Sequence, residues 1–164
     1  GYVGDVVKIN PSILECLMGE NLIPVISTIG TDSKGQAYNI NSDAVASALA
    51  GSLKAERLLY LTDVEGLLED VSDPASKISK IGISSLSDLI NEGTVKSGMI
   101  PKAQACIDAI KKGVASAHMV DGRIPHVLLL ELFTDAGIGT MVLPEDMLDL
   151  SKSENQDGVS NELV

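Results

Sequence analysis

Residues 39–43 read Asn-Ile-Asn-Ser-Asp and stand directly ahead of a helix-like run of small residues. In an extended segment alternate side chains share a face, so Asn39, Asn41 and Asp43 could point into one pocket. The amides could read a carboxylate or an N-acyl group, and Asp43 could hold a cationic group in place. The alternative is that Asp43 is a helix N-cap and that both asparagines occupy a turn.

A second polar segment, residues 60–67, follows a hydrophobic strand and contains Gly66. Ligands of open parallel sheets bind beyond the carboxyl ends of the strands, so Thr62, Asp63 and the backbone after them are placed to line a nucleotide pocket. The Asp63 carboxylate could contact a ribose hydroxyl there. An ordinary turn from strand to loop is the alternative.

A third segment, residues 93–102, is a glycine-containing loop that runs into a helix. The free N–H groups at a helix start form a partial positive charge, and Lys102 adds a full one, so together they could hold a phosphate. A cation in this position opposes the helix dipole by about 0.3–1 kcal/mol, which favours a lysine kept for an anionic partner. The segment does not match the P-loop signature, and a surface lysine is the alternative.

The elements that must position these segments alternate between short aliphatic runs and longer stretches with helical periodicity. This pattern predicts an α/β protein with an open, mostly parallel sheet and helices on both faces. Strands are expected at residues 3–8, 23–29, 57–61, 116–120 and 139–143. Helices are expected at residues 11–18, 43–53, 84–92, 101–112 and 125–133, with N-caps at Asp43 and Ser84. Turn residues between Ile29 and Tyr38 predict a hairpin, and residues 70–80 an exposed excursion.

The 164-residue chain is 45% hydrophobic, 2% aromatic and carries a net charge of −11. It therefore lacks the basic and aromatic surfaces of nucleic-acid-binding proteins, and its apolar runs are too short to cross a membrane. Residues 1–143 are expected to form one domain and residues 144–164 an acidic, disordered tail. Cys16 and Cys106 lie in aliphatic stretches and are expected to be reduced core thiols, which suits a cytoplasmic protein.

The two histidines, His118 and His126, lie eight residues apart with no cysteine or carboxylate at ligand spacing. A metal site is therefore not expected from the sequence, and the histidines are interpreted as satisfied core or surface residues. The sequence also lacks the short signatures of nucleophilic hydrolases.

Several segments together resemble the C-terminal, nucleotide-binding lobe of the amino acid kinase family, in the branch that phosphorylates N-acetylglutamate. The segments that carry the resemblance are residues 23–30, 38–43, 61–67 and 97–102. The resemblance extends over residues 1–143 in the family's order and implies its three-layer α/β sandwich. Residues 118–140 resemble the members that are inhibited by arginine and form hexamers.

The resemblance implies transfer of a phosphoryl group from ATP to the side-chain carboxylate of N-acetyl-L-glutamate, with Mg²⁺ held mainly by the ATP phosphates. By motif position, Asn39 and Asn41 would contact the N-acetylglutamate. Asp43 would organise the catalytic lysines, and Lys102 would stabilise the transferring phosphoryl group. The residues that would surround the nucleotide are Thr62, Asp63, Val64, Glu65, Gly66, Leu67, Leu68, Thr94, Val95, Lys96 and Met99.

The chain departs from the family pattern because the motifs of the family's N-terminal lobe are not in the sequence. These motifs are a Lys-x-Gly-Gly loop, a glycine-rich loop for the acyl amino acid and a substrate-binding arginine. We therefore expect this chain to be inactive alone, to require the missing N-terminal lobe, and to belong to a homo-oligomer with L-arginine as feedback inhibitor. The alternatives are a non-catalytic module that senses ATP or arginine, and a family kinase acting on aspartate, glutamate or uridylate.

Overall fold

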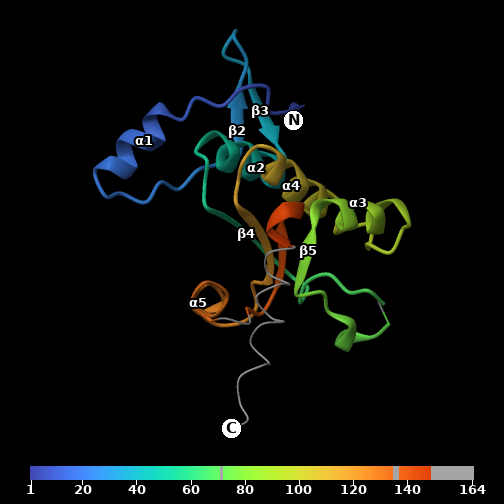
Figure 1. Cartoon of the computed structure of the whole chain (residues 1–164). Coiled ribbons are helices and arrows are strands. Elements are labelled where there is room, and N and C mark those ends of the chain that lie inside the picture. Colours follow the sequence, from blue (N-terminus) through green and yellow to red (C-terminus); the bar gives the residue numbers. More distant parts are fainter. Residues whose placement is uncertain (71, 135–136, 149–164) are drawn as a thin grey trace.

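A computed structural model describes residues 1–70, 72–134 and 137–148 (Figure 1). Among these residues, no helix is both long and apolar enough to cross a membrane. In chain order the elements are β1 (Val3–Gly4), α1 (Ser12–Gly19), β2 (Ile29–Thr31), β3 (Ala37–Ile40), α2 (Ser42–Ser52), β4 (Arg57–Thr62), the 3₁₀ helix η1 (Pro74–Ser76), β5 (Lys80–Gly82), α3 (Ile83–Asn91), α4 (Ile100–Lys111), β6 (Ser116–Asp121), α5 (Val127–Phe133) and β7 (Thr140–Leu143). All the predicted helices are present, with their ends within two residues of the prediction.

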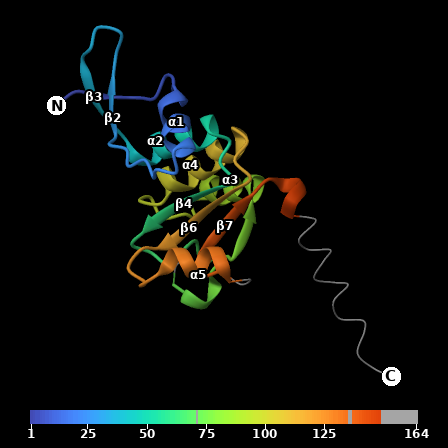
Figure 2. The same cartoon turned by 90° about the vertical axis from the view of Figure 1, so that its left-hand side faces the viewer.

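The larger sheet has the strand order β4-β6-β7-β5. β4 is parallel to β6 and β5 is parallel to β7, whereas β6 and β7 are antiparallel. Helices α3 and α4 cover one face of this sheet and α5 covers the other (Figure 2). Every residue of β6 is buried, because both faces of this central strand are covered. The predicted α/β class, with helices on both faces of the sheet, is confirmed.

A second, smaller sheet has the order β1-β3-β2 and projects away from the larger one (Figure 1). β2 and β3 form the antiparallel hairpin that the turn residues predict. The hairpin turn is fixed by Asp32, whose carboxylate accepts hydrogen bonds from the backbone N–H groups of Gln36 (3.0 Å) and Lys34 (2.8 Å). These bonds stabilise the ionised carboxylate and lower its pKa.

Two predicted strands are wrong over most of their length. Residues 3–8 form a strand only at Val3–Gly4, and residues 23–29 only at Ile29. Both are apolar runs, which normally indicate burial, yet Val7 is 97% and Val25 96% exposed. Within the described residues, the rest of each run has no neighbouring strand to pair with. Conversely, β5 was not predicted, because it is short and begins inside the expected exposed excursion.

Three smaller predictions also need correction. Ser84 is not an N-cap: α3 begins one residue earlier, after Gly82, and the Ser84 N–H donates to the Glu145 carboxylate (3.1 Å). Cys16 is exposed, because α1 buries only Leu14 in this chain. Cys106 is buried as expected, and burial raises the pKa of its thiol to about 12. In the expected tail, residues 145–148 are helical, and residues 149–164 lie outside the described part.

His118 belongs to a buried polar network beneath α5. Its Nδ1 lies 2.7 Å from the Glu131 carboxylate and its Nε2 lies 2.9 Å from the Ser116 hydroxyl. The same carboxylate accepts hydrogen bonds from the backbone N–H groups of Ile138 (2.7 Å) and Gly139 (3.0 Å). Glu131 therefore ties α5 to the central strand and to the start of β7, and His118 is a satisfied core histidine.

Burial opposes the ionisation of Glu131, but the hydrogen bonds from His118, Ile138 and Gly139 outweigh it and hold the pKa of Glu131 below its usual value of 4.5. Because the folded-state pKa is below the unfolded-state value, this stabilisation is fully present above pH 4.5. It is lost as the pH falls through the folded-state pKa.

The substitution Glu131→Gln should lower the free energy of unfolding by about 3 kcal/mol at pH 7, because the amide cannot accept all the hydrogen bonds that the carboxylate accepts. Urea denaturation at pH 7 and pH 4 measures this effect and the smaller acid sensitivity expected of the variant. Glu56→Gln, on the surface, is the matched control and should change stability by less than about 0.5 kcal/mol. Equal stability of Glu131→Gln and the unsubstituted chain would contradict the role given to this network.

Candidate functional site

The side chains of Asp43 and Lys102, which are 59 residues apart in sequence, form an ion pair. The Lys102 Nζ lies 3.0 Å from Oδ1 and 2.8 Å from Oδ2 of Asp43, and both side chains are partly buried. Asp43 lies in the first turn of α2 and Lys102 in the first turn of α4. The pair therefore brings the N-termini of two helices together at one place.

The first turn of α2 is fixed from two sides. Asn41 is its N-cap, and the side-chain oxygen accepts hydrogen bonds from the N–H groups of Asp43 (2.9 Å) and Ala44 (3.2 Å). From the sheet, the hydroxyl of Tyr60 in β4 donates to the Asp43 carbonyl at 2.9 Å. Burial raises the pKa of Tyr60, so the hydroxyl remains a donor at neutral pH. The position of the Asp43 carboxylate is thus set by both a cap and a strand.

The electrostatics of this corner favour an anion. Asp43 and Lys102 neutralise each other, whereas each helix N-terminus adds roughly half a positive charge. The first-turn N–H groups of Asp43 and Ala44 already donate to Asn41 Oδ1, and that of Ile100 in α4 donates to the Lys96 carbonyl. The positive surplus of this corner therefore comes from the two helix dipoles, and it suits the oxygens of a phosphate group.

A pocket of about 290 Å³ opens beside this corner. Every expected nucleotide residue except Thr62 lines it, together with Arg123. The apolar part of its wall consists of Val64, Leu67, Leu68, Val95 and Met99, and the charged part of Asp63, Glu65, Lys96 and Arg123. Met99 is the N-cap of α4, three residues before Lys102, so the pocket lies at the same end of α4 as the ion pair. An apolar wall with a charged rim suits a base with its ribose and phosphates.

The loop that forms one wall of the pocket requires glycine at position 66. Gly66 has a φ of +138°, and a Cβ atom there would lie 2.6 Å from the Thr140 hydroxyl oxygen. That oxygen accepts a hydrogen bond from the Leu67 N–H at 2.9 Å and donates to the Ile78 carbonyl at 2.7 Å. The close approach therefore fixes the loop against β7.

Four predicted site residues, Asn39, Asn41, Asp43 and Thr62, do not share the arrangement that the sequence suggests. β3 ends at Ile40, so Asn39, Asn41 and Asp43 do not lie along one extended segment. Asn39 is an exposed strand residue, and the N-cap is Asn41, not Asp43. Thr62 lies behind the pocket, where its hydroxyl donates to the Val64 carbonyl (2.7 Å) and shapes the loop. Its role is to hold the residues that line the wall.

Arg123 is a pocket residue that the sequence reading missed. It follows Asp121, the last residue of the buried strand β6, as residues 63–66 follow β4. A polar residue just beyond a buried strand is the same signal that identified the second segment, so it could have been found. No group of three or more histidine, cysteine or acidic residues suited to a metal ion occurs among the residues that the structure describes.

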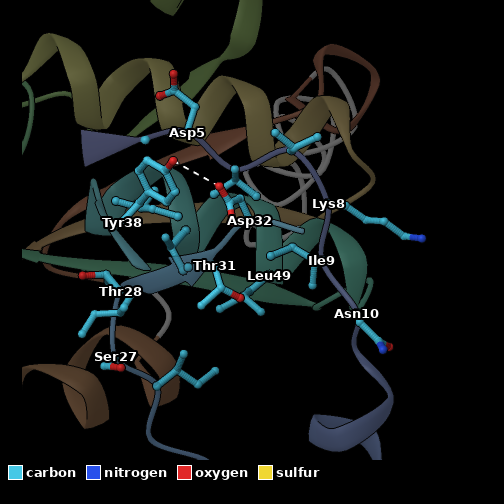
Figure 3. Close-up of a pocket in the computed structure, with 18 of the residues that line it drawn as sticks. Asp5, Lys8, Ile9, Asn10, Ser27, Thr28, Thr31, Asp32, Tyr38 and Leu49 are labelled. Carbon is cyan, nitrogen blue, oxygen red and sulfur yellow. Dashed lines mark hydrogen bonds between the residues drawn. The ribbon is translucent and has the colours of Figure 1, made fainter. Parts of the chain in front are cut away.

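A larger cleft of about 980 Å³ lies between the N-terminal segment, the β2–β3 hairpin and α2 (Figure 3). Asp5 and Lys8 come from the N-terminal segment, and the Tyr38 hydroxyl donates to the Asp32 carboxylate at 3.2 Å from the hairpin. The first 31 residues also expose many large apolar side chains, namely Tyr2, Val3, Val7, Ile13, Met18, Leu22, Ile23, Val25, Ile26 and Ile29. Exposed apolar surface of this extent marks an interaction site.

Comparison with known proteins identifies the family, because the family model described as "Amino acid kinase family" matches residues 1–121. The chain belongs to the amino acid kinase family. An acetylglutamate kinase of Moorella thermoacetica is 51% identical over 144 residues, which are 88% of this chain and 49% of that protein. One from Methanocaldococcus jannaschii is 49% identical over 142 residues, 87% of this chain and 47% of that protein. The chain thus spans about half the length of these curated relatives.

Solved structures share the fold of this chain. An N-acetylglutamate synthase from Neisseria gonorrhoeae, complexed with coenzyme A and L-arginine, has a TM-score of 0.78 and 26% identity over 88% of this chain and 33% of its own. A carbamate kinase from Giardia lamblia bound to AMP-PNP has a TM-score of 0.68 and 22% identity over 87% of this chain and 47% of its own. The second likeness concerns the fold alone.

The cap geometry predicts different effects for the two asparagines. Asn41→Ala should lower the free energy of unfolding by about 1 kcal/mol, because the first turn of α2 loses the acceptor for two N–H groups. Asn39→Ala, on the exposed side of β3, is the matched control and should have less than half of this effect. Urea denaturation measures both, and equal losses would contradict the assignment of Asn41 as the cap.

Proposed function

We propose that this chain is the ATP-binding half of an enzyme that phosphorylates the side-chain carboxylate of N-acetyl-L-glutamate, a step of arginine biosynthesis. The observation that carries the proposal is the ion pair of Lys102 and Asp43 (2.8 Å) at the joined N-termini of α2 and α4, beside a pocket with an apolar wall. The relatives named acetylglutamate kinase, which are 51% and 49% identical to this chain in sequence, support the choice of substrate.

In this proposal the base and ribose of ATP occupy the 290 Å³ pocket, and the phosphates reach the two helix N-termini. Phosphoryl transfer depends on positioning and on charge stabilisation, so the essential groups are donors aimed at the moving phosphoryl. Lys102 is the cation at that place, and Asp43 fixes its ammonium group. The carboxylate acceptor is already ionised at neutral pH, so the reaction needs no general base.

The residues of this chain fit a Mg²⁺ ion that arrives with ATP. Mg²⁺ prefers oxygen ligands, keeps several waters and is bound chiefly through nucleotide phosphates and one or two carboxylates. When bound, it would neutralise charge on the phosphates. The Asp43 carboxylate is already bound to Lys102. This chain would therefore contribute positive charge, from Lys102 and from the N-terminal ends of the two helix dipoles.

The missing half of the site would be supplied by an N-terminal lobe docked in the 980 Å³ cleft. Val7 lines this cleft and is 97% exposed. Val25, which directly precedes the lining residue Ile26, is 96% exposed. Burying such side chains contributes about 1.5–3 kcal/mol each, which favours a partner of complementary apolar surface. The match covers 49% of the Moorella thermoacetica relative, which supports a second lobe about as long as this chain.

A non-catalytic module that senses nucleotide or L-arginine is the second candidate, because the described residues form the pocket while the sequence lacks the motifs of the family's N-terminal lobe. Inhibition by L-arginine, assembly into a homo-oligomer and a cytoplasmic location stay predictions from the sequence. A family kinase with aspartate, glutamate or uridylate as acceptor is a third candidate. Activity with the separate acceptors distinguishes these candidates.

The chain alone should show no N-acetylglutamate-dependent turnover of ATP, and turnover should appear when the N-terminal half of the Moorella thermoacetica relative is added as a second chain. In that mixture Lys102→Ala should lower kcat by about 10²–10³, because a donor to the transferring phosphoryl is lost. A coupled ADP-release assay measures both. Lys111→Ala, at the far end of α4, is the matched control and should keep activity within about twofold. Ordinary turnover by Lys102→Ala would contradict the mechanism.

Docking of the second lobe predicts a separate effect of surface charge. The double substitution Val7→Asp with Val25→Asp should prevent the added lobe from restoring activity and should leave ATP binding to this chain unchanged. Phe133→Asp is the matched control, since Phe133 is also exposed, at 79%, but lies on α5, on the other side of the larger sheet. Analytical ultracentrifugation of the mixtures follows the complex directly. Undiminished association of the double variant would exclude this cleft as the docking surface.

A further inference from the structure

Arg123 enters the pocket from the end of a second strand. β4 and β6 are parallel neighbours, and Thr62 at the end of β4 is paired with Asp121 at the end of β6. The Gly122 N–H donates to the Thr62 carbonyl at 2.8 Å, which ties the two strand ends together. The turn after β6 therefore delivers Arg123 to the rim formed by the loop after β4.

The guanidinium of Arg123 is held by a buried carboxylate. Asp121 accepts from Nε at 2.8 Å and from Nη2 at 2.7 Å, and it also accepts the Arg123 backbone N–H at 3.0 Å. The Asp121 side chain is only 7% exposed, whereas the Arg123 side chain is 65% exposed. These hydrogen bonds and the positive charge hold the pKa of Asp121 at about 2, so the pair is intact at any physiological pH.

The clamp leaves one edge of the guanidinium unused. Nε and Nη2 face Asp121, and Nη1 has no hydrogen-bond acceptor in the part of the chain that the structure describes. Asp121 is buried and its contact with Arg123 is bidentate, so the pair fixes the guanidinium while most of the Arg123 side chain, at 65% exposure, stays open to a ligand. A guanidinium that is already oriented loses less side-chain entropy when it binds an oxygen.

The charges on the rim of the pocket favour a contact between the free Nη1 of Arg123 and a nucleotide. Asp63 and Glu65 line the same pocket and face Arg123, and their carboxylates would repel the phosphates of a nucleotide. Lys96 is the other cation on the rim, but its ammonium group sits on a flexible chain. Arg123 is the cation whose position is fixed.

We propose that Arg123, oriented by Asp121, binds the nucleotide by donating from Nη1 to an oxygen of its ribose or phosphates. The inference rests on the proposed function of the pocket as an ATP site. Arg123 is the contacting residue and Asp121 the positioning residue. Lysine at position 123 would keep the charge and lose the two-point contact with Asp121.

Calorimetric titration of the 164-residue chain with Mg·ATP tests this assignment. Arg123→Gln should weaken binding at least tenfold, and Arg123→Lys and Asp121→Asn should each weaken it severalfold. Arg57→Gln is the matched control, an arginine outside this pocket, and should bind ATP as the unsubstituted chain does. Titration with adenosine locates the contact: a loss confined to ATP indicates phosphate, and a loss with both ligands indicates ribose.

Unchanged ATP affinity of folded Arg123→Gln would overturn the inference and leave the ATP site itself intact. If Arg123→Gln fails to fold, unchanged ATP affinity of Arg123→Lys overturns the inference equally, because lysine also lacks the guanidinium that Asp121 orients. An equal loss in Arg57→Gln would mean that general charge, not a contact, is responsible. Absence of ATP binding to the unsubstituted chain would overturn the proposed function and this inference together.

Discussion

The ion pair between Asp43 and Lys102 depends on two helices that lie side by side in the same direction. α2 and α4 meet at their N-termini through this pair, and near their other ends Gly51 lies so close to Lys112 that a Cβ there would be 2.6 Å from the Lys112 Cβ. Small residues line the contact, including the buried Ala50 and Ala109. Close packing of small residues therefore sets the direction in which both helix dipoles point.

The direction of these helices places the candidate site at one edge of the sheet. β4 and β6 are parallel and end together, and the loops after them reach the same pocket as Met99 at the start of α4. Parallel strands and their helices leave strand carboxyl ends and helix N-termini at one edge, where donors and loops meet. The charge of Lys102, unfavourable for α4 alone, is offset by Asp43 from α2.

The helices and the pocket residues just after β4 could be predicted, because helical periodicity and polar residues after a buried strand are local signals. The pocket residues Thr94, Val95, Lys96 and Met99 were expected only through the family resemblance. The meeting of Asp43 with Lys102 was expected only through the family resemblance, since no local pattern links residues 59 positions apart. The strands at residues 3–8 and 23–29 were overpredicted because an apolar run indicates burial without indicating what buries it. Arg123 was missed because its segment was interpreted only through a resemblance, although its position after β6 matches that of Asp63 after β4.

The most direct test of the central claim is a crystal structure of the chain with Mg²⁺ and a non-hydrolysable ATP analogue. The account predicts the base against Val64, Leu67 and Met99, and a phosphate oxygen about 3 Å from the Lys102 Nζ, with Asp43 still bound to the same ammonium group. A nucleotide bound elsewhere, or phosphates directed away from the N-termini of α2 and α4, would contradict it.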